Sequence, residues 1–98
     1  MTISSSMNNG ILTVKPVGRL DSSTSEEFGS YLEENVTDEV KELKFDFGGV
    51  DFISSKGLRI LVLVYKKLNG RRMEITGAND AVREVLRLSD FLTLFNVN

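Results

Sequence analysis

Short β-type runs alternate with helical stripes along this chain, and that alternation restricts the fold more than any other feature of the sequence. Two β-prone runs, at residues 2–7 and 11–17, open the chain. They flank Asn8-Asn9-Gly10, and Asn-Gly between β-type runs is a strong signal for a tight hairpin. Helical and strand patterns then take turns, so we expect the element order β-β-α-β-α-β-α.

Three segments carry apolar residues at helical spacing, each preceded by residues that favour a helix N-cap. They are residues 25–34, residues 56–68, and a third helix that is capped by Asn79 or Asp80 and carries its apolar stripe to Leu88. In the second segment the expected stripe is Leu58, Leu61, Val62, Tyr65 and Leu68. Three further apolar residues fall partly outside this stripe, and we expect core burial for them rather than docking: Ile60, Leu63 and Val64.

Two more strands separate these helices. Leu43, Phe45 and Phe47 alternate with polar residues until Gly48-Gly49 breaks the pattern, and a short strand follows at residues 72–76. Strands joined by helices of this length imply crossovers and at least partly parallel pairing. We therefore expect one α/β domain over residues 1–98, with a single mixed sheet of about four to five strands, an N-terminal β-hairpin and about three helices.

Two expectations concern the second strand. Gly18-Arg19-Leu20-Asp21 is expected to form a turn at its end. Pro16 is expected near that end, because proline cannot donate to a sheet ladder. The apolar tail at residues 91–97 favours neither a helix nor a strand.

The composition argues against catalysis. The chain has no His and no Cys, which removes the usual general base, the commonest metal ligand and thiol chemistry. There is no phosphate-binding loop motif, and Asp46 and Asp51 have no further ligands at a recognisable spacing. We expect no catalytic residue, no metal and no cofactor.

Charge and hydropathy limit the partners. The net charge of −2 gives no overall positive field for nucleic acid. The longest apolar run, residues 60–65, is far below the roughly 20 residues that span a bilayer. The first residues also lack the pattern of a secretory signal, so we expect a cytoplasmic protein without nucleic-acid or membrane contact.

The segment Ser54-Ser55-Lys56-Gly57-Leu58 carries the most functional information. Functional groups of parallel sheets gather at the carboxyl ends of strands, which directs attention to residues 18–24 and 48–57. A Ser at a helix N-terminus can hold an added phosphate against free backbone N–H groups. Plain N-capping is the alternative role, and spacing alone favours it.

Two of these motifs together resemble the STAS domain, the fold of bacterial anti-sigma factor antagonists. They are Val17-Gly18-Arg19-Leu20-Asp21 and the run from Val50 to Leu61, which contains Ser-x-Gly-Leu at residues 55–58. The resemblance spans nearly the whole chain. It implies a protein that binds an anti-sigma factor, itself a serine kinase with a GHKL-type ATP site, and so frees a sigma factor. Phosphorylation by that kinase would end the binding.

The resemblance also assigns roles to residues. Ser55 matches the family's phosphoacceptor, and the adjacent Ser54 is a rival acceptor. Asp21 matches the acid of the family's Gly-x-Leu-Asp loop, close to the phosphorylatable helix start. The residues expected to contact the partner are Asp21, Ser54, Ser55, Lys56, Gly57 and Arg59. We expect a monomer or a weak dimer.

The chain departs from the family pattern on both sides of Ser55. Ser54 stands where the antagonists often carry Asp, and Lys56 stands where they usually carry a small residue, so the local charge becomes basic. Two other functions therefore stay open. One is a STAS interaction module that is never phosphorylated, within a sensory or lipid-transport assembly; the other is a nucleotide-binding STAS module.

Overall fold

Six strands form one mixed sheet in the computed structural model, which describes residues 1–89 and 96–97. The elements are β1 (Thr2–Asn8), β2 (Ile11–Leu20), α1 (Ser25–Asn35), β3 (Glu42–Asp46), β4 (Gly49–Ile53), α2 (Ser55–Leu68), β5 (Arg72–Thr76), α3 (Asp80–Leu88) and β6 (Asn96–Val97). The sheet order is β1-β2-β3-β5-β6, and β4 pairs with the C-terminal part of β2, from Val17 to Leu20. Among the described strands, β1 and β2 pair antiparallel and the other ladders are parallel.

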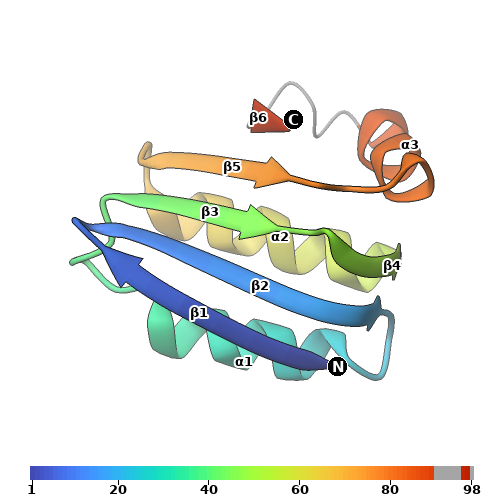
Figure 1. Ribbon diagram of the computed structural model, residues 1–98, viewed down its shortest axis with the longest axis horizontal. Coiled ribbons are helices and arrows are strands. Elements are labelled where there is room, and N and C mark those ends of the chain that lie inside the picture. The colour runs from blue at the N-terminus through green and yellow to red at the C-terminus, as the bar shows by residue number, and fades with distance from the viewer. Residues whose placement is uncertain (90–95, 98) are drawn as a thin grey trace.

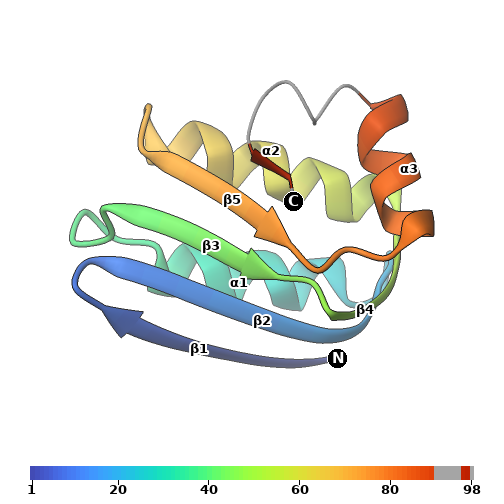
Figure 2. The same cartoon turned by 45° about the horizontal axis from the view of Figure 1, so that its top comes forward.

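Helices α1 and α2 lie side by side on one face of the sheet, and α3 lies beyond the carboxyl end of β5 (Figure 1). Figure 2 shows the same two layers after rotation, with the opposite face of the sheet left open. The expected α/β class, the N-terminal hairpin and the three helices are confirmed. The tail expected at residues 91–97 lies mostly outside the described residues, and only Asn96–Val97 is described as a strand.

The hairpin forms because its two central residues accept a left-handed backbone. Asn9 has φ 54° and Gly10 has φ 82°. Positive φ at both positions defines the turn whose twist matches two antiparallel strands. Asn8 therefore pairs directly with Ile11, and the register runs on to Thr2 opposite Val17.

The core lies between the sheet and the pair α1 and α2. Three phenylalanines at its centre are fully buried: Phe28 of α1, Phe45 of β3, and Phe47 directly after β3. The ring centroid of Phe45 lies 5.8 Å from that of Phe28 and 5.6 Å from that of Phe47. Alternation along β2 and β3 sends every second side chain into this layer.

The prediction of a turn at residues 18–21 is wrong, because β2 continues as a strand to Leu20. Its last four residues pair in parallel with β4, with a register shift between Gly18 and Arg19. Pro16 accordingly lies inside the strand and not near its end. It falls in the interval where β2 changes partners, since pairing with β3 stops at Val14 and pairing with β4 starts at Val17.

The burial expected along α2 is only partly confirmed. Val64 is buried in the core, whereas Val62 and Tyr65 lie at its edge. Leu63 is 51% exposed, contrary to the expected burial. In α3, Asn79 caps the helix by accepting a hydrogen bond from the Val82 amide, as expected, but the last residue of the predicted stripe, Leu88, is exposed. In the described part of the chain, no helix has the length and apolar character needed to cross a membrane.

Candidate functional site

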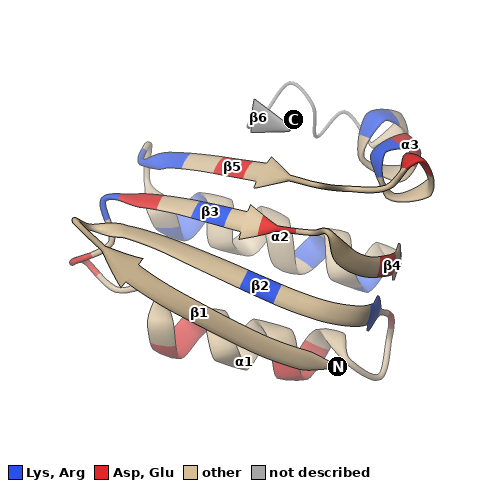
Figure 3. Ribbon diagram, in the orientation of Figure 1, with Lys and Arg blue, Asp and Glu red and all other residues tan. Residues whose placement is uncertain are grey.

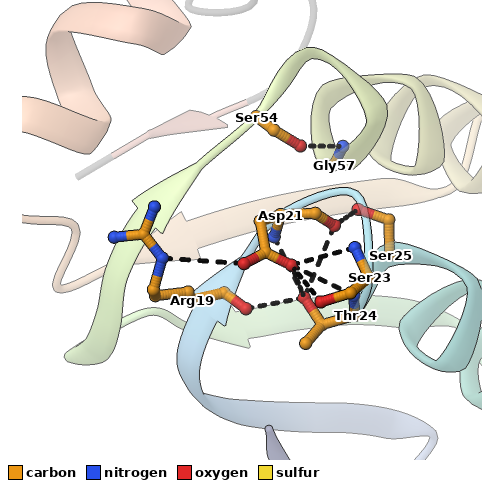
Figure 4. A network of polar contacts seen from close by, with 7 residues as sticks. All are labelled: Arg19, Asp21, Ser23, Thr24, Ser25, Ser54 and Gly57. Carbon is orange, nitrogen blue, oxygen red and sulfur yellow. Dashed lines mark hydrogen bonds and ion pairs between the residues drawn. The ribbon is translucent and has the colours of Figure 1, made fainter.

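The two segments singled out by their position after β-strands meet in space. Leu20, the last residue of β2, pairs with Ile53, the last residue of β4. The Ser54 amide then donates a hydrogen bond of 2.8 Å to the Leu20 carbonyl. The turn after β2 and the start of α2 therefore form one site at the carboxyl edge of the sheet, and Figure 4 shows them together.

Asp21 organises the turn after β2. Its Oδ1 accepts hydrogen bonds from the Ser23 hydroxyl (2.8 Å), the Ser23 amide (3.0 Å) and the Thr24 amide (3.2 Å). Its Oδ2 lies 3.6 Å from the Arg19 Nε. These hydrogen bonds, that of the Ser23 hydroxyl foremost, lower the pKa of the Asp21 carboxyl from 3.8 to about 2. The Asp21 carboxylate thus fixes the backbone of the turn that leads into α1. Thr24 occupies the N-cap position of this helix, but its side chain makes no capping hydrogen bond.

This lowered pKa predicts an acid-sensitive contribution from Asp21. Because the folded-state pKa lies below the ordinary value, the ionised carboxylate stabilises the fold above about pH 4, and this stabilisation disappears as the pH falls through about 2. Asp21→Asn should therefore lower the melting temperature at neutral pH, and the difference from the wild type should shrink between pH 4 and 2. Thermal unfolding across that range measures it. An unchanged difference at every pH would show that the carboxylate charge has no such role.

The two adjacent serines have different roles. Ser54 has extended backbone (φ −93°, ψ 173°) and occupies the N-cap of α2, where its hydroxyl oxygen accepts a hydrogen bond of 3.2 Å from the Gly57 amide. Ser55 is the first residue of the helix and is exposed. Within the described residues, the Ser55 hydroxyl makes no hydrogen bond. The structure thus gives the capping role to Ser54 and leaves the Ser55 hydroxyl open to a partner.

This division of roles predicts different costs for removing each hydroxyl. Ser54→Ala deletes the cap and should lower the free energy of unfolding by about 1 kcal/mol. Ser55→Ala removes no hydrogen bond and should change it by less than about 0.5 kcal/mol. Urea unfolding of the two variants measures both values. Equal losses of unfolding free energy in the two variants would show that both hydroxyls cap α2.

The other expected partner-binding residues divide between surface and core. Lys56 and Arg59 are exposed on the first turns of α2, and Asp21 is partly exposed. Gly57 is buried, and an added Cβ would lie 2.9 Å from Ile53 Cγ1 and 2.9 Å from Leu20 Cγ. Gly57 therefore serves packing, allowing α2 to approach β2 and β4, and is not available to a partner's side chains.

One pair beside the site was not recognised from the sequence. The Arg19 guanidinium lies over the ring of Phe52, 4.6 Å from its centroid, and Phe52 is 38% exposed. The parallel register between β2 and β4 sets these two residues opposite each other, and that register has no local signal in the sequence. Lys56 and Arg59 place two exposed positive charges close to Ser55 in sequence, whereas Arg19 lies 3.6 Å from the Asp21 carboxylate. Across residues 1–89 and 96–97, no three Asp or Glu side chains gather as they would to hold a metal ion.

Comparison with known proteins assigns this fold to a family. The model of the STAS domain matches residues 2–98, and the chain belongs to that family. The candidate anti-sigma factor antagonist BtrV of Bordetella bronchiseptica is 33% identical over 91 residues, which cover 91% of this chain and 78% of BtrV. The resemblance inferred from the motifs is thereby confirmed.

Solved structures agree. An anti-sigma factor antagonist from Mycobacterium paratuberculosis superposes with a TM-score of 0.90 at 25% identity, covering 98% of this chain and 83% of that one. The unphosphorylated form of the anti-sigma factor antagonist SpoIIAA gives 0.85 at 16% identity, over 99% and 88% of the two chains. Its phosphorylated form, from Bacillus, gives 0.76 at 15% identity, over 99% and 91%. The likeness to SpoIIAA establishes the shared fold.

Proposed function

We propose that this protein is an anti-sigma factor antagonist whose binding to its anti-sigma factor is switched off by phosphorylation of Ser55. The observation that carries the proposal is the free, exposed hydroxyl of Ser55 at the start of α2, beside a Ser54 hydroxyl that is engaged as the cap. BtrV and the Mycobacterium paratuberculosis structure, described as anti-sigma factor antagonists, support the role. The two solved forms of SpoIIAA support a switch by phosphorylation.

Electrostatics at this position favour a switch that leaves the fold intact. A phosphate adds about 1.5 to 2 negative charges, and the positive end of the α2 dipole tolerates an anion there. Lys56 and Arg59 lie on the same helix start, so the unmodified surface is basic. Phosphorylation would reverse this local charge, and the partner surface that fits the basic form would then repel the modified one.

Ser54 is the poorer acceptor for a physical reason. Its hydroxyl caps the helix, and its amide is bonded to the Leu20 carbonyl. A kinase would have to pull this side chain away from the Gly57 amide before transferring a phosphate. The Ser55 hydroxyl needs no such rearrangement. We further propose that the kinase is the anti-sigma factor itself, of the GHKL type, and that both proteins act in the cytoplasm, where sigma factors direct transcription.

A capture experiment from a lysate of the source cell tests the proposal. Wild type, Ser55→Ala and Ser55→Asp serve as baits, and mass spectrometry identifies the bound proteins. The proposal predicts that a GHKL-type serine kinase binds to the wild type and to Ser55→Ala but not to Ser55→Asp. Identical partners on all three baits would contradict the switch, and would indicate an interaction module that works without phosphorylation.

A further inference from the structure

The two helices that cover the sheet carry opposite and equal charges. Helix α1 has four acids and no base, and α2 has four bases and no acid. All eight side chains are exposed: Glu26, Glu27, Glu33 and Glu34 on α1, and Lys56, Arg59, Lys66 and Lys67 on α2. Figure 3 shows the acidic helix and the basic helix side by side. Among the described residues, no carboxylate of α1 forms an ion pair with a cation of α2; Lys67 instead donates to the backbone carbonyl of Glu33.

An apolar groove of about 430 Å³ runs between these helices. Its apolar and small lining residues are Gly29, Ser30 and Leu32 of α1 and Ile60, Leu63 and Val64 of α2. Leu63 stands out of the helix layer with 51% of its surface exposed, and lies in sequence midway between the two pairs of bases. Ser30 has the corresponding position on α1: it lies in sequence midway between the two pairs of acids, and its side chain is short.

We propose that this helix layer is the contact between two copies of the chain, with each α1 packed on the α2 of the other copy. A matching surface must carry an acidic and a basic helix side by side around an apolar centre, and the chain's own helix layer is such a surface. The eight charges, which form no ion pair among the described residues of one copy, would find opposite charges in the second. Leu63 of each copy would enter the groove of the other beside Gly29 and Ser30.

The direction of the helices fixes the symmetry. Both α1 and α2 connect strands that run parallel, so the two helices point the same way. A two-fold axis parallel to the helices then places acidic α1 over basic α2. A two-fold axis perpendicular to the helices would instead place α1 over α1 and α2 over α2 of the second copy, so that like charges face each other. Only the first arrangement is electrostatically complementary.

The size of the contact predicts a weak dimer. At about 1.5 Å of rise per residue, the helices are roughly 16 and 21 Å long, so the shared patch is about 20 Å on each side. Such a patch lies at the low end of specific interfaces. We therefore expect a reversible dimer that sedimentation velocity detects as protein concentration rises and that weakens with added salt.

A charge-swap experiment tests the arrangement. Lys66→Glu/Lys67→Glu reverses one end of α2, and Glu33→Lys/Glu34→Lys reverses the matching end of α1. Each double variant alone should be monomeric at concentrations where the wild type dimerises, because like charges would then face each other. An equimolar mixture of the two should form a heterodimer, since both helix contacts regain opposite charges.

The control applies the same charge change elsewhere. Lys15→Glu/Lys44→Glu alters the open face of the sheet and should leave dimerisation unchanged, and circular dichroism checks that every variant is folded. A wild type that stays monomeric at all concentrations would overturn the proposal. So would a dimer that survives both charge reversals, or a mixture of the two variants that fails to associate while both are folded.

Discussion

Ser55→Asp is expected to weaken binding of the purified anti-sigma factor by at least tenfold, which is about 1.4 kcal/mol. The change places a fixed negative charge on a basic, exposed helix start, beside Lys56 and Arg59. A partner surface suited to those cations would meet an anion instead. Isothermal titration calorimetry measures the dissociation constant. The melting temperature should change little, because the helix dipole favours a negative charge at this end.

The adjacent residue supplies the matched control. Ser54→Asp adds the same charge one position earlier, and Asp is as good an N-cap as Ser, so the hydrogen bond to the Gly57 amide is retained. This variant should bind the anti-sigma factor much more nearly like the wild type. If both variants lost binding equally, charge anywhere on this loop would be sufficient, and the special position of Ser55 would be refuted.

Gly57→Ala is expected to lower the free energy of unfolding by about 1–3 kcal/mol, as overpacking does in a filled core. In an exposed helix interior, the same change normally adds up to about 1 kcal/mol of stability. The sign reverses here because the new Cβ would lie 2.9 Å from Leu20 and from Ile53, which are both buried. In thermal unfolding, the melting temperature should fall by about 4–8 °C for each kcal/mol of stability that is lost.

Gly29 provides the comparison within the same chain. A Cβ at Gly29 of α1 would also meet a neighbour at 2.9 Å, but that neighbour is Cδ1, the outer end of the Ile60 side chain. Ile60 is only partly buried and can rotate away. Gly29→Ala should therefore be neutral or slightly stabilising. A stable Gly57→Ala protein would show that α2 does not need this close approach to β2 and β4.

Local signals in the sequence were sufficient for most elements. The hairpin at Asn9-Gly10 and the cap of α3 at Asn79 each depend on one or two residues with strong local preferences, and both occur in the structure. The alternation of strands and helices likewise predicted the α/β class with parallel pairing. The rule that functional groups gather at the carboxyl ends of parallel strands singled out the two site loops, and the family resemblance implied that Asp21 lies close to the start of α2.

The errors arose where a distant partner decides the local structure. Residues 18–20 have the composition of a turn, yet they are a strand because β4 pairs with them. The same change of partner makes room for Pro16 inside β2. The helical period assigned Val62 to the apolar stripe of α2, but packing against the sheet buries Val64 in the core and leaves Val62 at its edge. Similarly, the extended backbone of Ser54 and its hydrogen bond from the Gly57 amide distinguish Ser54, the cap, from Ser55, and neither is visible in the sequence Ser-Ser.

Mapping the phosphorylated residue is the sharpest test of the proposed switch at Ser55. The protein is incubated with the captured anti-sigma kinase and ATP, digested, and sequenced by tandem mass spectrometry, with Ser55→Ala and Ser54→Ala treated in parallel. We expect a single phosphate on Ser55, its retention in Ser54→Ala and its loss in Ser55→Ala. A phosphate on Ser54, or none on a wild type that binds the kinase, would refute the proposed switch at Ser55.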